Sequence, residues 1–272
     1  MNARVSSCHN IRCLALRNVL CLALGIALLP FAAFAQVMQN QSDDLKTSIA
    51  SVQAGSFSNA DIETVARAGA AQGVLPALEQ QLARATDVTT QGIVANALVR
   101  LGDKDNTYWN FLLQQATLAV DSDLPDPFHD SKGNATGQQL SPEFKAWVQA
   151  HNVDASTAIH SALYDLPIKV MLLGETGDPR GIPLLRRALQ SHNYQIVAWA
   201  AKGLALIQDK ESIPLIIAAV QRVPPDYTSL VAESLVYFDD AQAQSAVDTY
   251  MPKDKAVMAR QERARGRGVF GW

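Results

Sequence analysis

A block of small and apolar residues recurs along the chain and ends each time at an aspartate. Three copies begin at residues 169, 200 and 231, which are 31 residues apart, and a fourth begins at residue 94. Within each block the apolar residues are three or four positions apart, which places them on one face of a helix. A glycine or polar residue followed by the aspartate is typical of a helix end and of the cap of the next helix. The four blocks, called boxes below, are 94–103, 169–178, 200–209 and 231–240.

A second apolar pattern follows the boxes. Ile182-Pro183-Leu184 and Ile213-Pro214-Leu215 occupy equivalent positions, thirteen residues after their box begins. Proline suits the first turn of a helix, where a backbone N–H has no partner within the helix. Each repeat is therefore expected to be two short antiparallel helices, and such pairs bury their apolar faces only by stacking on one another. The pattern predicts an all-α fold, a short α-solenoid.

The repeats predict the division of the chain. The second-helix pattern recurs at 75–82 and at 244–251, and a degenerate helix over 61–71 is expected to cap the N-terminal end, which gives four to five helix pairs over 60–252. Boxes 94 and 169 lie 75 residues apart, so an insertion is expected at about 117–160. The remaining ranges are predicted to be a leader at 1–35, a linker at 36–59 and a basic tail at 253–272.

These residues resemble a known repeat family. The run from Gly177 to Leu185, and the box from Ala200 to Leu204 ahead of Asp209, resemble HEAT-like repeats of the phycobilisome-lyase type, and the resemblance extends over roughly 60–251. It implies a curved solenoid whose inner helices present a binding surface. Families with this repeat include chromophore lyases, hydroxylases that bind iron through His-Glu pairs, and interaction scaffolds. The sequence contains no His-Glu dipeptide, which argues against the hydroxylase activity. An exported chain without cysteine or an evident pigment context argues against the lyase activity, so neither activity is carried over.

The first 35 residues have the pattern of a secretory signal peptide. Arg4, Arg12 and Arg17 precede an apolar stretch at 19–29, and the small-residue triplet 33–35 follows, with removal expected after Ala35. An uncleaved anchor is the alternative, but the apolar stretch is shorter than the roughly 20 residues that a membrane span needs. The pattern therefore predicts a periplasmic or secreted protein.

Removal of the leader changes the composition of the chain. All three cysteines lie in the leader, so the mature chain is expected to have no disulfide and no cysteine nucleophile. The 23 basic residues fall to 20 against 26 acidic ones, a net charge of −6, which disfavours a nucleic-acid partner. No apolar run after Ala35 is long enough to cross a bilayer. The hydrophobic content of 48% is enough for a buried core.

The insertion contains the residues that could carry chemistry. Carboxylate oxygens are ligands for hard cations such as Ca²⁺, but their spacing here matches no EF-hand loop. His129 and Asp130 are adjacent on a loop and so are not expected to form a catalytic pair. Ser141-Pro142-Glu143 is typical of a helix start. The weak metal candidates are Asp121, Asp123, Asp126, His129 and Asp130.

Candidate binding residues come from the box helices, at positions outside the apolar stripe or bordering it. They are Asn96, Arg100, Trp199, Lys202 and Glu233. The leading hypothesis is an exported module that binds or scaffolds another protein, without a cofactor or catalytic residues. The alternative is an enzyme or metal-binding protein with a site built by the insertion around His129, and a third hypothesis is a structural domain of an envelope assembly.

The tail combines basic and aromatic residues. Six lysines and arginines lie between Lys253 and Arg267, ahead of Phe270 and Trp272. One interpretation is a weak contact with the anionic cell envelope or an acidic partner. The favoured interpretation is a short helix over 254–265 that frays into solvent.

Overall fold

The computed structural model describes residues 43–102 and 106–271, and its regular elements within these ranges are helices. An isolated bridge joins His129 and Ala135. The predicted signal peptide lies outside the described residues. In the described part, no helix has both the length and the hydrophobicity that a membrane span requires. The all-α prediction is confirmed.

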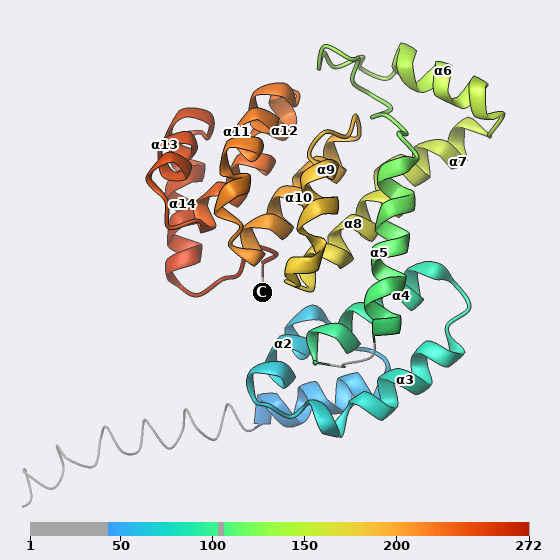
Figure 1. The fold of residues 1–272 in the computed structure, drawn as a ribbon, viewed down its shortest axis with the longest axis vertical. Coiled ribbons are helices and arrows are strands. Elements are labelled where there is room, and N and C mark those ends of the chain that lie inside the picture. Colours follow the sequence, from blue (N-terminus) through green and yellow to red (C-terminus); the bar gives the residue numbers. More distant parts are fainter. Residues whose placement is uncertain (1–42, 103–105, 272) are drawn as a thin grey trace, which may run out of the picture.

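The box helices form one layer of the molecule (Figure 1). Helix α8 packs between α4 and α10, and α10 packs against α12. Each of these helices carries one of the boxes, so equivalent residues of successive repeats lie side by side. We call them the inner helices. They are α4 (Val88–Arg100), α8 (Leu166–Glu175), α10 (Tyr194–Ile207) and α12 (Pro225–Ala232), which the short 3-10 helix η5 (Glu233–Tyr237) continues.

The second helices of the repeats form the other layer. Pro183 and Pro214 lie in the first turns of α9 and α11, as the pattern predicts. A 3-10 turn precedes α3, α9 and α11 and reverses the chain between the layers. These outer helices are α3 (Leu75–Arg84), α5 (Asn106–Asp121), α9 (Ile182–Ala188), α11 (Ile213–Arg222) and α13 (Ala241–Tyr250). Together with α2 (Asn59–Arg67), which Ser58 and Asp61 cap, the described part holds five helix pairs.

Two glycines allow α8 and α10 to approach closely. A Cβ atom on Gly203 would lie 2.8 Å from the Cα of Gly174 and 3.0 Å from Leu185 Cδ1. Such a distance to backbone cannot be accommodated by a side-chain rotation. The contact between the middle repeats therefore depends on the absence of side chains at these positions.

The apolar interior has two main parts that meet at α4. One part runs from α5 to the C-terminal segment, and the other joins the N-terminal helices. Within α4, Ala95 belongs to the first part and Val94, Ala97 and Leu98 to the second. A smaller cluster around Leu124 and Phe144 holds the insertion together.

The structure differs from the predicted boundaries in two places. The linker predicted at 36–59 contains a helix at 43–54, and Val52 of this helix is fully buried against the N-terminal helices. The insertion begins after Asp121, because α5 extends to that residue. The predicted helix start at Ser141 is confirmed, since Ser141 caps α6 (Pro142–His151).

The insertion rejoins the solenoid through a bent helix. Helix α7 (Ala155–His160) continues through one π-helical turn, Ser161–Asp165, into α8. Pro167 lies just after this turn, and proline cannot donate the backbone hydrogen bond of a regular helix. A widened turn of this kind is a usual way to accommodate the missing donor.

The prediction that the tail frays into solvent is wrong. Helix α14 (Lys253–Ala264) packs against α13 and η5, with Ala256 buried. The segment after α14 then turns back, and Val269 is only 4% exposed. Figure 1 shows this end of the chain inside the arc formed by the inner helices, close to α2. The tail therefore covers part of the surface that the repeats were expected to leave open.

Candidate functional site

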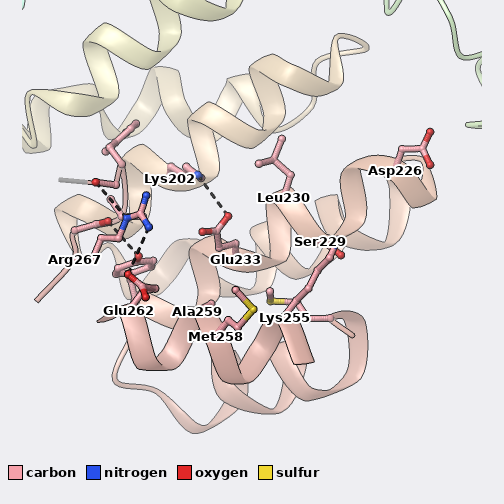
Figure 2. Close-up of a pocket in the computed structure, with 16 residues that line it drawn as sticks. Lys202, Asp226, Ser229, Leu230, Glu233, Lys255, Met258, Ala259, Glu262 and Arg267 are labelled. Atoms are coloured by element: carbon pink, nitrogen blue, oxygen red, sulfur yellow. Dashed lines mark hydrogen bonds and ion pairs between the residues drawn. The ribbon is translucent and has the colours of Figure 1, made fainter. Parts of the chain in front are cut away.

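A groove of about 580 Å³ lies on the concave side, between α10, α12, η5, α14 and the C-terminal segment. We call it the main groove. Figure 2 shows Lys202 and Glu233 on one wall and Met258 and Glu262 on the other. The lining combines charges of both signs with exposed apolar side chains, including Leu230 at 36% and Met258 at 63% exposure.

Three of the predicted binding residues come together at this groove. The Lys202 ammonium lies 3.6 Å from Glu233 Oε2 and 5.4 Å from the centre of the Trp199 ring. Lys202 is buried at 9% exposure, whereas Glu233 is half-buried, so the carboxylate is the more accessible member of the pair. The Lys202 charge is thus held by a carboxylate and an aromatic face, both of which attract a cation.

The C-terminal segment forms one side of the groove. The Phe270 ring lies parallel to Trp199, with ring centres 6.0 Å apart and an angle of 6° between the planes. The Tyr237 hydroxyl donates a hydrogen bond of 3.1 Å to the Gly268 carbonyl oxygen. Burial raises the pKa of Tyr237, and Glu233 adds to the effect, so this hydroxyl keeps its proton as a donor.

A second cavity of about 350 Å³ lies on the other side of the same segment. Arg100, the fourth predicted residue, lines it together with Glu175 and Glu63. The Arg100 side chain is 6% exposed and donates to Glu63 Oε2 at 3.3 Å and to Asn59 Oδ1 at 2.9 Å. Arg100 therefore belongs to a buried charged cluster under the C-terminal segment, not to the open groove.

Glu175 is the least solvated acid of this cluster. Its Oε2 atom is buried and has no hydrogen-bond partner among the described residues, while Oε1 accepts from Asn59 at 3.4 Å. Burial raises the pKa of Glu175 to about 7, and the nearby Arg100 charge opposes that effect only in part. The carboxyl group is therefore able to gain or lose a proton near neutral pH.

Asn96, the fifth predicted residue, does not face the groove. It is 2% exposed, and its side-chain amide donates a hydrogen bond of 2.6 Å to the Leu172 carbonyl oxygen. This bond joins α4 to α8. The sequence predicts Asn96 as a binding residue, but its side chain instead joins two inner helices. The reason is that α4 and α8 lie closer together than the repeat pattern alone indicates.

The groove residues share two positions of the repeated box. The seventh position holds Arg100, Glu175, Leu206 and Tyr237, all of which line one of the two cavities. The third position, four residues earlier, holds Lys202 and Glu233. The register of the boxes also indicates Glu175 and Tyr237, which are not among the predicted binding residues. Phe270 lies outside the repeats, so no periodic signal points to it.

The insertion brings Asp126 and His129 together. Asp126 is 2% exposed, and its carboxylate accepts from His129 Nδ1 at 2.9 Å and from the Tyr227 hydroxyl at 3.2 Å. His129 Nε2 is buried, with Asp226 Oδ2 3.6 Å away. Burial, then the Asp126 charge, raises the pKa of Tyr227. Since Tyr227 and Asp226 belong to α12, this cluster joins the insertion to the solenoid.

Two of the other weak metal candidates, Asp123 and Asp130, line a cavity of about 460 Å³ together with His129, but each of the other candidates has a different partner. Asp121 pairs with Arg187 at 2.8 Å, and Asp123 pairs with His192 at 3.1 Å. Asp130 accepts backbone hydrogen bonds from Lys132 and Asn134 within its own turn. Within 43–102 and 106–271, no three histidine, cysteine or acidic side chains are grouped as a metal site requires. The structure therefore does not assemble the five residues into one site.

Comparison with known proteins found one similarity. Residues 169–236 match the family model of HEAT repeats, a range that covers most of α8 and extends to Val236 in η5, and that includes Trp199, Lys202 and Glu233. A search of the curated proteins and a search of the solved structures found no match to the chain.

Proposed function

Since this chain is a HEAT-like repeat protein, we propose that it binds or scaffolds another protein through the main groove. The observation that carries the proposal is the placement of Lys202, Glu233 and Leu230 from successive inner helices around one open groove. Charged and apolar side chains in one concave surface suit a protein surface, which offers both kinds of contact. Repeats of this family commonly mediate protein–protein interaction.

The insertion supports this proposal over a catalytic site around His129. Both oxygens of the Asp126 carboxylate are hydrogen-bonded, and Nε2 of His129 is covered by protein. A general base needs its nitrogen within reach of the substrate. The Asp126–His129 pair is better explained as the contact that fixes the insertion to α12.

Affinity capture with the full chain tests the proposal. Leu230→Arg places a long charged side chain in the main groove, whereas Leu215→Arg makes the same change at an equally exposed leucine of the outer helix α11. We expect the wild type and Leu215→Arg to capture the same proteins from an envelope extract, and Leu230→Arg to lose them. Equal capture by the two variants would refute binding through this groove.

We further propose that the protein is exported, with a leader that is removed after Ala35. The basic and apolar order of residues 1–35 supports this, and the mature protein would begin at Gln36. Mass spectrometry of the N-terminal peptide from fractionated cells tests it. A peptide that begins at Gln36 is expected, and an intact Met1–Ala35 segment on the purified protein would contradict the proposal.

A weak contact of the tail with the anionic envelope is a secondary proposal. Lys253 and Lys255 are exposed and support it. The arginines of the tail are less suited, since Arg260 pairs with Asp248 and Arg263 with Asp239 at 2.7 and 2.6 Å. Cosedimentation with anionic vesicles is expected to fall when both lysines are changed to Glu, and unchanged sedimentation would contradict the contact.

A further inference from the structure

The segment after α14 is directed into the concave side by its own sequence. Gly266 has a φ of 87°, and the Arg267 N–H donates to the Glu262 carbonyl oxygen at 3.0 Å. This is the hydrogen bond of a Schellman motif, which ends a helix and reverses the chain. A second turn follows, in which the Gly271 N–H donates to the Gly268 oxygen at 2.9 Å.

Val269 and Phe270 occupy the tip of this second turn. Val269 is 4% exposed, and Phe270 stacks on Trp199. A methyl group on Gly174 would lie 3.4 Å from Phe270 Cζ, so the ring also lies against the glycine surface of α8. Two hydrogen bonds also hold the backbone of this turn. The Tyr237 hydroxyl donates to the Gly268 carbonyl oxygen, and Arg267 Nε donates to the Gly271 carbonyl oxygen at 3.2 Å.

We infer that the Gly268–Gly271 turn occupies the place of the partner, and that the partner presents a tight turn with an aliphatic and an aromatic side chain at its tip. This inference rests on the proposed function, because the turn forms one side of the main groove and a partner that displaces the turn enters the groove from that side. The Trp199 face and the glycine surface of α8 receive the aromatic ring. The Tyr237 hydroxyl binds the carbonyl oxygen of the first residue of the turn.

Occupancy by the chain's own tail regulates this binding. The tethered tail competes with a partner at an effective concentration of about 1 mM. A partner must therefore bind more tightly than the tail does, or the tail must first be released. The apparent affinity for a partner equals the intrinsic affinity multiplied by the fraction of molecules whose groove is free. Loss of the Phe270 ring is therefore expected to strengthen binding in trans, provided that Trp199 remains.

The test uses the full chain and a fluorescent peptide of residues 266–272, whose sequence is GRGVFGW. We expect the peptide to bind Phe270→Ala at least about tenfold more tightly than the wild type, measured by fluorescence polarisation. The double variant Trp199→Ala with Phe270→Ala is expected to lose binding. A peptide with Ala in place of Phe serves as the control ligand and is expected not to bind.

Thermal unfolding confirms that each variant is folded before binding is compared. No binding of the peptide to folded Phe270→Ala at about 1 mM would overturn the inference. Equal binding to the single and double variants would overturn it too. Light scattering tests for exchange of tails between molecules, and a wild-type dimer that Phe270→Ala abolishes would identify a second copy as the occupant and overturn the inference.

Capture experiments separate this inference from the proposed function. If Leu230→Arg abolishes capture but the peptide neither binds Phe270→Ala nor competes with the captured protein, the groove binds a partner of different chemistry and only the inference fails. If the peptide binds Phe270→Ala but Leu230→Arg captures the same proteins as Leu215→Arg, the proposed function fails while the tail contact stands.

Discussion

At the scale of single residues, the Glu175 carboxyl group has a pKa that its surroundings raise strongly. It is 2% exposed, one of its oxygens has no hydrogen-bond partner in the described part of the chain, and Arg100 is the nearby charge that favours its ionised form. Burial of a carboxylate without full compensation favours the protonated acid. The fold therefore tolerates Glu175 best when its carboxyl group is neutral.

This environment predicts a pH-dependent stability. The folded pKa of about 7 lies above the ordinary value of 4.5, so the stabilising contribution of the protonated form is complete below pH 4.5 and is lost as the pH rises through 7. Because one pKa unit corresponds to about 1.4 kcal/mol, the full difference is about 3 kcal/mol. Glu175→Gln should remove this contribution, since an amide does not ionise.

Urea unfolding of the wild type and Glu175→Gln at pH 5 and pH 8 measures the effect. The variant is expected to lose less stability between the two values than the wild type. Identical changes in the free energy of unfolding would show that Glu175 is solvated or fully paired in the folded protein.

The groove residues show how far single positions can be predicted from the sequence. The sequence pattern indicates Trp199, Lys202 and Glu233 because each lies outside the apolar stripe of a predicted helix or borders it. Asn96 shares the box position of Lys202 and Glu233 but does not line the main groove, because α8 lies close enough for the Asn96 amide to reach Leu172. Distances between helices depend on side chains from distant parts of the chain, which the repeat pattern does not contain.

At the scale of elements, α8 and α10 approach each other closely where Gly174 faces Gly203. Gly203→Ala adds a methyl group 2.8 Å from the Gly174 Cα atom and 3.0 Å from Leu185 Cδ1. Overpacking of this kind typically costs about 1–3 kcal/mol, and here it outweighs the better helix propensity of alanine. Chemical denaturation should show the loss. Gly73→Ala is the matched control, since a Cβ atom there meets nothing within 4 Å.

The insertion depends on His129 and Asp126 for its contact with α12. His129→Ala removes a donor from a buried carboxylate, a change that typically costs about 1–3 kcal/mol. We expect faster amide hydrogen exchange over 122–141, with α10 and α11 little affected. His160→Ala is the control, since the side chain of His160 is 65% exposed. Equal exchange in the two variants would contradict the proposed anchoring role.

The elements differ in how well the sequence predicts them. The paired helices were predictable because each repeat carries its own stripe, proline and cap. The helix at 43–54 also carries a stripe, Leu45, Ile49 and Val52, with spacings of four and three, but it matches no box. The tail helix was predictable, whereas its packing was not, because the contacts of Val269 and Phe270 are with residues far away in the sequence.

At the scale of the whole molecule, the stacked pairs give a curved surface that the chain partly covers itself. Each inner helix contacts mainly its neighbours, which is why a local repeat predicts the overall architecture. The insertion attaches at one side, and the tail closes part of the concave side. Both are long-range contacts, and together they decide which part of the groove is open to a partner.

Site-specific photo-cross-linking tests the central claim, that the concave groove is the partner-binding surface, most directly. A photoreactive amino acid replaces Leu230 in the main groove or Leu215 on α11, in the full chain, and the cross-linked products are compared after illumination of living cells. We predict a discrete protein adduct from position 230 and none from position 215. An adduct from position 215 alone, with none from position 230, would contradict the account.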